Sequence, residues 1–403
     1  MRRAWLAITL LSFLGAARAQ SPAQPSVQSP ELNVRLYAIH SPEEILITSR
    51  DDSARIRLCS KCATKPLTQP LAIRASGSRL LLTPPGNARA VYVSGAYRLD
   101  SPGNAPLPLQ MPLELFAENG RLRVQVQMPL EEYVAGVVAG EGVGFTSEEA
   151  LKAMAVVART FALHFIGRHR AEGFNLCDTT HCQDLHLGAI SARMRAAADA
   201  TRGEILWYEG RPAASFHHRH CGGSTEDARV VWPDEAAPYL RAQKDEYCLS
   251  RDPAQWSTTI AKRDIARALA ASHVVAPAHL ESLSIIDRSS SGRAMRLQLD
   301  GNEAVEIRAA DLRFALGRAL GWEKIPRDLY NVRDTGETII FEGRGAGHGV
   351  GMCQTGAAEL GSRGKTYREI LSFYYPGTKL SATAPLAASS VGSRRPQGDA
   401  TRP

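Results

Sequence analysis

The sequence predicts an α+β fold, in which a helical segment that ends in a candidate acid packs against strand-rich regions. From residue 32 to about 126, apolar and polar residues alternate in short runs that Pro, Gly and Asn separate, as in strands. Residues 129–200 instead repeat apolar residues at three- and four-residue spacing, as helices do. Residues 203–380 return to strands and turns, with helices expected near 261–272 and 365–373.

The ends of the chain predict export. Residues 1–19 combine two arginines, an apolar run and a small-x-small site, which is typical of a cleaved secretory signal; an uncleaved anchor is the alternative. Residues 20–31 form a Pro/Gln/Ser linker. We therefore expect an exported protein of the periplasm or cell envelope. Its strand-rich region spans 32–127, its core spans 128–380, and a disordered tail follows at 381–403.

The charge of the chain excludes one class of partner. The formal net charge is +7, of which the leader supplies +3 and the tail after Leu380 supplies +2. The folded part therefore keeps a charge of only +2, which is far from the basic patch of a nucleic-acid-binding domain. No nucleic acid is expected as a partner.

The first helix ends in a carboxylate. It begins at Pro129, since proline is tolerated in the first turn. One apolar stripe at helical spacing is formed by Leu130, Tyr133, Val134, Val137 and Val138. Glu141 follows this stripe at the same spacing, between two glycines. We therefore expect its side chain to continue the buried face at the end of the helix.

A second helix follows at once. Thr146 and Glu149 have the spacing of a capping box. The core face of this helix is formed by Leu151, Met154, Ala155, Ala158, Ala162 and Phe165. Arg159 lies at the edge of that face. The turn between the two helices could fold the second helix back so that Arg159 approaches Glu141.

The position of Glu141 suggests acid–base chemistry. A carboxyl group against an apolar surface loses hydration, which raises its pKa towards neutrality. A general acid needs such a pKa to hold a proton at physiological pH. A nearby Arg159 would lower the pKa again, so the two influences compete. A purely structural ion pair between the two residues, or a helix cap, is the alternative.

Cysteine and histidine clusters suggest a metal. The segment "CDTTHCQ" contains Cys177, His181 and Cys182. The segment "FHHRHCGGSTE" adds His217, His218, His220 and Cys221. Sulfur and imidazole ligands suit tetrahedral zinc. A structural zinc, a catalytic zinc and a disulfide remain open here, although no Glu or Asp motif accompanies the ligands as a zinc hydrolase would need.

The seven cysteines of the chain suggest disulfides first, because the chain is expected to be exported. The odd number leaves at least one thiol unpaired or bound to a metal. A local disulfide is expected between Cys59 and Cys62. A dyad of Cys353 as nucleophile and His348 as base is conceivable, but nothing in the sequence supplies a third, orienting group.

Six motifs in order resemble the stage II sporulation protein D family, which also contains the amidase enhancers (SpoIID/LytB). The motifs extend from about residue 111 to residue 380, two thirds of the chain. They are "PLEEYVAGVVAGE", "EALKAMAVVARTFAL", "CDTTHCQ", "GEILWYEGRPAASFHHRHCGGSTE", "PYLRAQKDEYC" and "GRGAGHGVGMCQTGAAELGSRGKTYREILSFYYPGTKL".

The resemblance implies an exported peptidoglycan lytic transglycosylase of cell-wall remodelling. Such an enzyme cuts the MurNAc–GlcNAc bonds of glycan strands that are stripped of stem peptides, and leaves 1,6-anhydro ends. Glu141 matches the catalytic acid of the family, and Arg159 matches a second residue important for activity. Glu141 would protonate the glycosidic oxygen and then take the proton of the attacking C6 hydroxyl. The alternative is a non-catalytic wall-binding module that enhances a partner N-acetylmuramoyl-L-alanine amidase.

The resemblance also implies a substrate groove, to which His348, Gln354, Tyr374 and Tyr375 are assigned. The chemistry itself requires no cofactor. Some members of the family hold zinc near the "CDTTHC" segment, which supports Cys177, His181 and Cys182 as ligands of a structural zinc.

The chain departs from the family pattern at three positions. The family usually has Ser where Cys353 stands, and aromatic residues where Ala346 and Thr355 stand. Loss of these aromatic rings could weaken the stacking of sugars in the groove.

Overall fold

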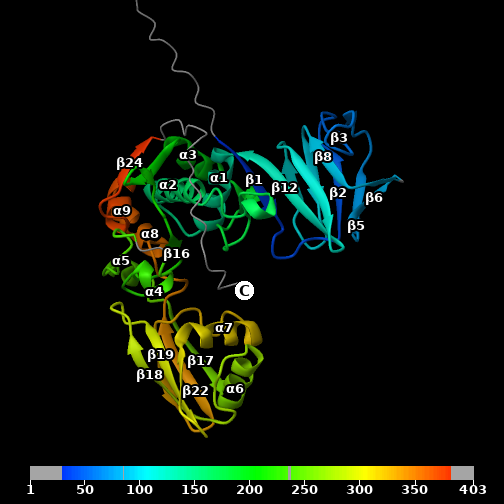
Figure 1. Ribbon diagram of the computed structural model, residues 1–403. Coiled ribbons are helices and arrows are strands. Elements are labelled where there is room, and N and C mark those ends of the chain that lie inside the picture. The colour runs from blue at the N-terminus through cyan, green and yellow to red at the C-terminus, as the bar shows by residue number, and fades with distance from the viewer. Residues whose placement is uncertain (1–29, 85, 235–236, 383–403) are drawn as a thin grey trace, which may run out of the picture.

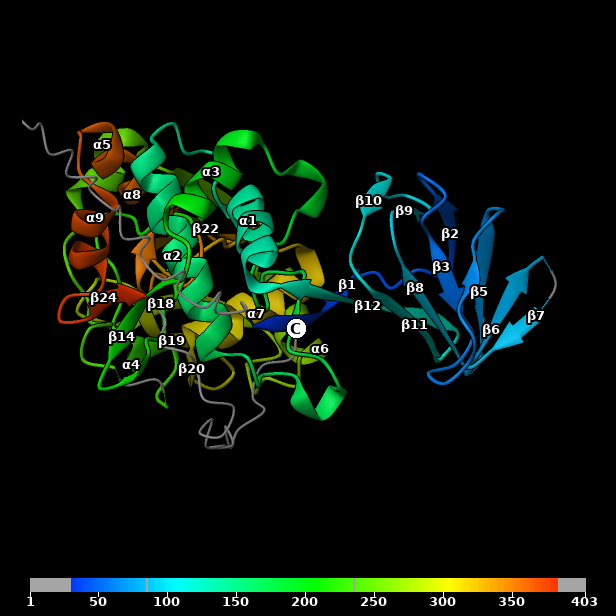
Figure 2. The same cartoon turned by 90° about the horizontal axis from the view of Figure 1, so that it is seen from above.

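The computed structural model describes residues 30–84, 86–234 and 237–382. Over these residues the α+β prediction is confirmed, and the chain forms three parts. Figure 1 shows a strand-rich part at the upper right, a helical part at the upper left and a third part below the helical one. Seen from above, the strand-rich part projects to one side of the other two (Figure 2).

The strand-rich part consists of two sheets that share one hydrophobic core. Its strands are β1 (Glu31–Leu36), β2 (Glu44–Ser49), β3 (Arg55–Arg57), β4 (Lys65–Pro66), β5 (Leu71–Ser76), β6 (Arg79–Thr83), β7 (Gly86–Ala88), β8 (Ala90–Ser94), β9 (Tyr97–Asp100), β10 (Leu107–Leu109), β11 (Leu113–Glu118) and β12 (Arg121–Pro129). One sheet has the order β13-β1-β12-β11-β8-β3-β4, in which β13 (Leu176–Cys177) comes from later in the chain, and the other has the order β10-β9-β2-β5-β6-β7. The predicted disulfide between Cys59 and Cys62 is confirmed.

The strand β12 leads directly into the helical part. It pairs antiparallel with β1 and with β11 along its length, and its apolar residues alternate into the core. Pro129 is both the last residue of β12 and the N-cap of helix α1 (Leu130–Glu141). The sheet therefore fixes the start of the helix at whose end Glu141 stands.

The helical part is built around α2 (Glu148–His164), which is buried along most of its length. Its other helices are α3 (Ala192–Ala200), α4 (Ala228–Val231), α5 (Glu246–Arg251), α8 (Gln354–Ser362) and α9 (Tyr367–Tyr374), with 3-10 turns at Arg170–Glu172 and Leu187–Ala189. Its strands are β13 (Leu176–Cys177), β14 (Glu204–Tyr208), β15 (Arg211–Pro212), β16 (His217–His218), β23 (Met352–Cys353) and β24 (Lys379–Ala382). The late helix expected near 365–373 is α9 and is confirmed.

The predicted capping box of the second helix is wrong. The helix begins at Glu148, with Ser147 as its N-cap and no side-chain bond at the cap. The Glu149 carboxylate instead accepts a hydrogen bond from the backbone N–H of Tyr367 and another from Lys152. A partner that is distant in the sequence thus replaces the local one. The capping box that does form lies on α9, between Thr366 and Glu369.

The third part is inserted between α5 and β23 and has a hydrophobic core of its own. It comprises β17 (Gln255–Ala261), α6 (Lys262–Ala271), β18 (Leu280–Arg288), β19 (Ala294–Gly301), β20 (Val305–Arg308), α7 (Ala309–Leu320), β21 (Tyr330–Asp334) and β22 (Thr338–Arg344). These strands form two three-stranded sheets, with the orders β17-β22-β21 and β18-β19-β20. The helix expected near 261–272 is confirmed as α6, whereas α7 and α8 were not expected.

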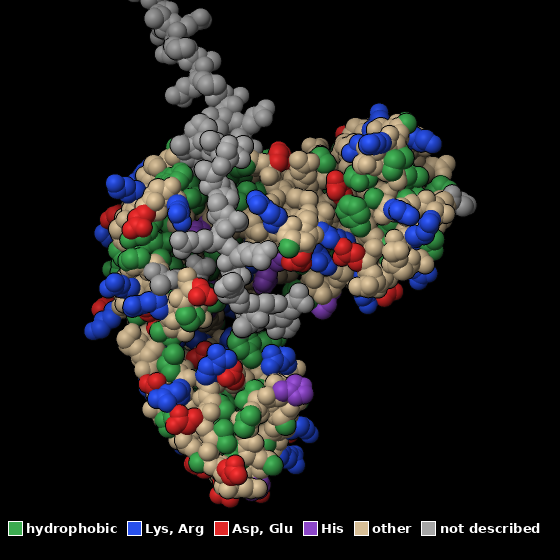
Figure 3. Space-filling view, viewed as in Figure 1, with side chains coloured by type: hydrophobic (Ala, Val, Ile, Leu, Met, Phe, Trp, Pro, Cys, Tyr) green, Lys and Arg blue, Asp and Glu red, His purple; other side chains and the backbone are tan. Residues whose placement is uncertain are grey.

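The predicted leader, nearly all of the predicted linker and nearly all of the predicted tail lie outside the described residues. Among the helices that are described, none has the length and apolar character needed to cross a bilayer. Figure 3 shows Lys and Arg side chains interspersed with Asp and Glu over the face seen there, without one continuous basic surface.

Candidate functional site

Glu141 stands at the end of α1 and lines a cleft of about 1020 Å³ in the helical part. Its side chain is 15% exposed, and three donors surround the carboxylate. His217 Nε2 lies 3.2 Å from Oε1, and the backbone N–H of Asp184 donates to the same oxygen over 3.1 Å. The Gln354 amide donates to Oε2 over 2.6 Å. The carboxylate is therefore held in one orientation at the wall of the cleft.

Two short strands bring these donors together. β16 carries His217 and pairs in parallel with β23, so that His217 lies opposite Met352 and His218 opposite Cys353. Gln354 follows β23 directly as the first residue of α8. A pair of strands from distant parts of the sequence thus delivers an imidazole and an amide to the end of α1.

Gly140 allows the backbone of Asp184 to pack closely against the end of α1. A Cβ atom at this position would lie 2.3 Å from the backbone oxygen of Asp184, a distance that no side chain tolerates. The glycine lets the Asp184 segment approach the helix, and that approach allows the Asp184 N–H to reach Glu141. The sequence around Glu141 is therefore matched to its hydrogen bonds.

The environment of Glu141 lowers the pKa of its carboxyl group. Burial, the largest single influence, raises this pKa, but the charge and hydrogen bond of His217, the Asp184 N–H and the Gln354 amide together outweigh it. The resulting pKa is about 2. The prediction that the apolar helix keeps Glu141 protonated is thus wrong for the free protein. At neutral pH the group is a carboxylate that faces His217.

The predicted approach of Arg159 to Glu141 is also wrong. Arg159 is fully buried and donates from Nε and Nη2 to both oxygens of Glu131, over 2.9 and 2.6 Å. After the turn that follows α1, α2 runs back alongside α1, so that Arg159 lies next to the first turn of α1. Glu141 lies ten residues further along the helix, about 15 Å away at 1.5 Å per residue.

Of the four residues assigned to the groove, two line the cleft. Gln354 contacts Glu141, and His348 also lines the cleft, where burial lowers its pKa to about 3 and keeps the ring neutral. Tyr374 and Tyr375 do not line the cleft, because both rings are buried in the core. Their hydroxyl groups donate to Asp245 and to the backbone oxygen of Phe216. Neither ring is therefore open to a ligand in this cleft.

The cleft has an aromatic wall that the sequence analysis missed. Trp232 lines it and stacks on Phe216, with ring centroids 4.4 Å apart and an interplanar angle of 27°. Its centroid also lies 4.9 Å from that of His348. Thr355, where the family usually has an aromatic residue, lines the same cleft, but its side chain carries no ring. Trp232 thus offers an aromatic face in a cleft from which the expected aromatic residue at position 355 is missing.

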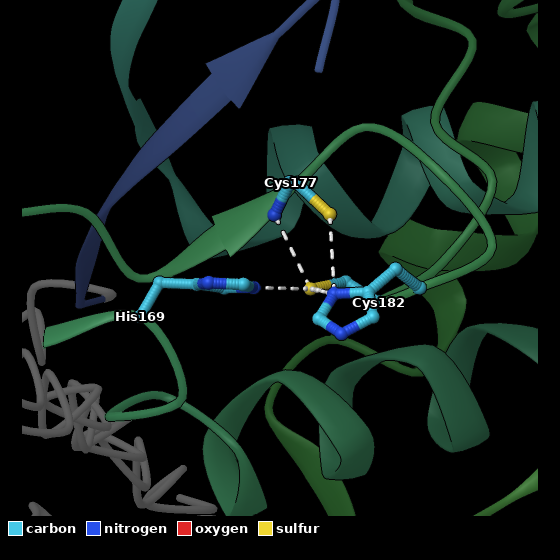
Figure 4. Close-up of side chains that lie close together, drawn as sticks. His169, Cys177 and Cys182 are labelled. Carbon is cyan, nitrogen blue, oxygen red and sulfur yellow. Dashed lines mark hydrogen bonds between the residues drawn. The ribbon is translucent and has the colours of Figure 1, made fainter. Parts of the chain in front are cut away.

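The three predicted zinc ligands do come together, and a fourth joins them. The ligand atoms of His169, Cys177, His181 and Cys182 all lie within 4.8 Å of one another. His169 Nε2 is 3.4 Å from Cys182 Sγ (Figure 4). His181 Nδ1 is 3.9 Å from Cys177 Sγ. Around tetrahedral zinc, sulfur and nitrogen ligands lie about 3.5 Å apart. These four side chains could therefore hold a zinc ion with little movement.

His169 was missed because it lies eight residues before Cys177, outside the "CDTTHC" motif. Its Nδ1 is 2.6 Å from Glu172 Oε1, which turns Nε2 towards Cys182. Such a carboxylate–histidine contact is typical of the partners behind metal ligands. With four protein ligands no coordination position remains open for water, which fits a structural rather than a catalytic zinc.

The histidines of the second predicted cluster do not join a metal site. His217 contacts Glu141, as described above. His218 Nδ1 lies 3.1 Å from the backbone oxygen of Val350, and His220 Nε2 lies 2.7 Å from that of Asp252. The dyad of Cys353 and His348, which the sequence left open, does not form either. Cys353 is fully buried against Cys221, whereas His348 packs on Trp232.

Comparisons with known proteins agree with these features. The family model described as "Stage II sporulation protein" (SpoIID) matches residues 118–208, and that of a domain of unknown function (DUF8618) matches residues 250–351. Stage II sporulation protein D of Bacillus subtilis is 28% identical over 281 residues, which are 63% of this chain and 75% of the relative. The amidase enhancer of the same species is 26% identical over 292 residues, 61% and 40% of the two chains.

The family follows from these matches, and a further relative is more similar in sequence. An uncharacterized protein of Brachyspira hyodysenteriae is 32% identical over 265 residues, which cover 65% of this chain and 69% of the relative. The chain belongs to the SpoIID/LytB family. Its SpoIID match ends at residue 208, before β16, and the DUF8618 match coincides with the inserted part. His217 therefore precedes the insertion and Gln354 follows it.

Proposed function

We propose that this SpoIID/LytB protein is an exported peptidoglycan lytic transglycosylase. It would cut the MurNAc–GlcNAc bonds of glycan strands stripped of stem peptides and leave 1,6-anhydro ends. The observation that carries the proposal is the Glu141 carboxylate in the wall of a large cleft, within 3.2 Å of His217 Nε2, a potential proton source.

The other acidic residues of the cleft are engaged elsewhere. Asp184 lies 3.1 Å from His186, and Asp252 accepts a hydrogen bond from the backbone N–H of Ala254. Most glycosidases need two carboxyl groups, one as acid and one as nucleophile or base. A single carboxyl group suffices if the nucleophile is the C6 hydroxyl of the substrate itself, since an intramolecular nucleophile has a high effective concentration.

Glu141 would obtain its proton from His217. In the free cleft the carboxylate is ionised, and a proton on His217 Nε2 would face it over 3.2 Å. A bound glycan strand would displace water and make the separated charges less favourable than the neutral acid and neutral imidazole. The proton would then lie on Glu141 when the scissile bond is in place. His217 is thus a positioning and proton-holding residue behind the acid.

The reaction would proceed without consuming water. Glu141 gives its proton to the leaving glycosidic oxygen as the C1–O4 bond breaks. The Glu141 carboxylate then takes the proton of the C6 hydroxyl as O6 bonds to C1. One proton is given and one is taken, so the acid is restored and the product carries a 1,6-anhydro ring.

Two further features would support the strand. Trp232 offers an aromatic face on which a sugar ring could pack, and the neutral His348 beside it could share a hydrogen bond with a hydroxyl group.

We propose that His169, Cys177, His181 and Cys182 hold a structural zinc. Asp184 follows Cys182 by two residues, so the ion would fix the segment whose N–H holds Glu141.

A second function is supported by one comparison. The relative named amidase enhancer shares 26% identity with this chain, so a wall-binding module that enhances an amidase is the alternative. That module would bind glycan strands without cutting them. The two functions therefore differ in whether the purified chain releases products by itself.

Cleavage of stripped glycan strands by the purified protein tests the proposal. Glu141→Gln should lower the rate at least about 100-fold, as loss of a general acid does, while strand binding is retained. Glu132→Gln on the same helix is the matched control and should cleave like the wild type, because Glu132 contacts Arg195 at the surface. Equal rates for Glu141→Gln and the wild type would contradict the proposal. Binding without cleavage by the wild type would favour the amidase-enhancing module.

A further inference from the structure

A second group of metal-ligating side chains lies where the inserted part joins the helical part. The ligand atoms of Cys221, Asp245, Cys248 and Cys353 all lie within 4.8 Å of one another, and all four residues are buried. Cys221 follows β16, Asp245 is the N-cap of α5, and Cys353 is the N-cap of α8. Four potential ligands from three distant segments thus meet at one point.

The contacts within this group suit a metal better than a disulfide. Cys221 Sγ lies 3.0 Å from Cys248 Sγ, which is beyond a covalent S–S bond of about 2.05 Å. Asp245 Oδ2 lies 3.2 Å from Cys221 Sγ and accepts a hydrogen bond from the Tyr374 hydroxyl over 2.9 Å. A hydrogen-bonded carboxylate in this position resembles the oriented ligands of metal sites.

Backbone groups also point at the sulfur atoms. The N–H of Cys221 and the N–H of Gly356 donate to Cys353 Sγ over 3.2 and 3.4 Å. The N–H of Gly223 donates to Cys248 Sγ over 3.3 Å. Such donors stabilise negative charge on sulfur, because hydrogen bonds to an ionised acceptor are stronger than bonds to a neutral one. Thiolates, not thiols, bind metal ions.

Two arginines of the inserted part lie beside the group. Arg293 donates to the backbone oxygen of Cys221 over 3.0 Å, and Arg327 donates to that of His220. Arg293 also lies 3.6 Å from Glu226, whereas Arg327 forms no ion pair among the described residues. Three thiolates and a carboxylate around a divalent cation would carry a net charge of −2. Buried guanidinium groups nearby would offset that charge.

We propose that Cys221, Asp245, Cys248 and Cys353 bind a second structural zinc ion. Three sulfur ligands and one carboxylate oxygen complete a tetrahedron, so no position remains for water. The Cys221 and Cys248 sulfurs would separate by less than about 1 Å to reach the spacing of zinc thiolates. The proposal does not rest on the transglycosylase activity, and it concerns residues distinct from the His169 group.

This ion would hold the two ends of the inserted part together. Cys248 precedes the matched insertion 250–351 by two residues, and Cys353 follows it by two. Cys353 directly precedes Gln354 in the sequence, and Gln354 donates a hydrogen bond to Glu141. Cys221 lies four residues after His217, the other side chain that contacts Glu141. The ion would thus connect both ends of the insertion to the two side chains that orient the candidate acid.

Zinc content tests the proposal directly. The full chain, purified without chelator, should contain two zinc ions per molecule by inductively coupled plasma mass spectrometry. Cys248→Ser and Cys353→Ser should each retain one ion, and so should Cys182→Ser, which removes the other group. Cys182→Ser combined with Cys248→Ser should retain none. An unchanged zinc content in both Cys248→Ser and Cys353→Ser would overturn the proposal.

Thiol counting on the wild type separates zinc from a disulfide even if a variant fails to fold. Five cysteines are free besides the disulfide between Cys59 and Cys62. Titration of the unfolded chain, without reductant and with chelator, should therefore find five thiols. Three thiols, with a disulfide mapped between two of Cys221, Cys248 and Cys353, would show a disulfide in place of the ion and would overturn the proposal. Cobalt substitution of Cys182→Ser should give thiolate-to-cobalt charge-transfer absorption, and its absence would also contradict the site.

Discussion

His217 Nε2 lies 3.2 Å from Glu141 Oε1, so an imidazole on β16 controls the charge of the carboxylate at the end of α1. Burial raises the pKa of Glu141, and this contact is the first among those that lower it, ahead of the Asp184 N–H and the Gln354 amide. The proposed acid is therefore one half of a proton-sharing pair. The two halves come from distant parts of the sequence.

Replacing His217 should raise the pKa of Glu141. In His217→Asn the charge that lowers the pKa is gone while burial remains, so the carboxyl group should titrate above its value of about 2 in the wild type. Carbon-13 NMR of labelled glutamate side chains would measure it. His186→Asn, which removes a ring that contacts Asp184 but not Glu141, is the control. An unchanged titration in His217→Asn would show that the imidazole does not set the pKa.

The ion pair of Arg159 and Glu131 should act on stability. Replacing Arg159 by Met leaves a buried carboxylate without its partner, which costs about 3–5 kcal/mol of unfolding free energy. Glu131→Gln should lower the unfolding free energy by a similar amount. The double variant should lose less than the sum of the two single losses, and denaturant unfolding would measure all three. The rate of cleavage per folded molecule should change little. Intact stability with lost cleavage in Arg159→Met would instead support the role in activity that the family resemblance implies.

The group at His169 should lose its ion when a single ligand is removed. His169→Ala should contain one zinc fewer per chain than the wild type and should unfold at a lower temperature, because the ion binds the folded state. His164→Ala is a matched control, since this exposed histidine contacts the backbone oxygen of Pro212 and the ring of Phe165 but no residue of the His169 group. Equal zinc content in His169→Ala and His164→Ala would remove His169 from the ligand set.

The stability of the protein should fall below pH 6.5 because of His218. Burial lowers its pKa well below the ordinary 6.5, and the charges of Arg327 and Arg293 add to this. The folded state then binds the proton more weakly than the unfolded chain does. Its stabilisation is complete above pH 6.5 and is lost as pH falls, by up to about 1.4 kcal/mol per unit. Denaturant titrations from pH 7 to 5 should show a steeper loss for the wild type than for His218→Asn, and equal slopes would contradict this.

The sequence predicted what depends on local periodicity. The apolar spacing of α1 placed Glu141 at the helix end, and the alternation of residues 32–126 marked the strands. The partners of Glu141 could not be found this way, because the pairing of β16 with β23 brings His217 and Gln354 together across the insertion. For the same reason the partner of Arg159 could not be predicted, because it depends on how α2 folds back along α1. His169 lies outside the "CDTTHC" motif, and only the fold brings it to the other three candidate zinc ligands.

The mass of the terminal sugar released from stripped glycan strands tests the central claim most directly. The account predicts 1,6-anhydro ends, which are lighter than reducing ends by one water, from the wild type and from Glu132→Gln but not from Glu141→Gln. Reducing ends would show that water, and not the C6 hydroxyl, attacks the anomeric carbon. That result, or anhydro ends from Glu141→Gln at the wild-type rate, would contradict the account.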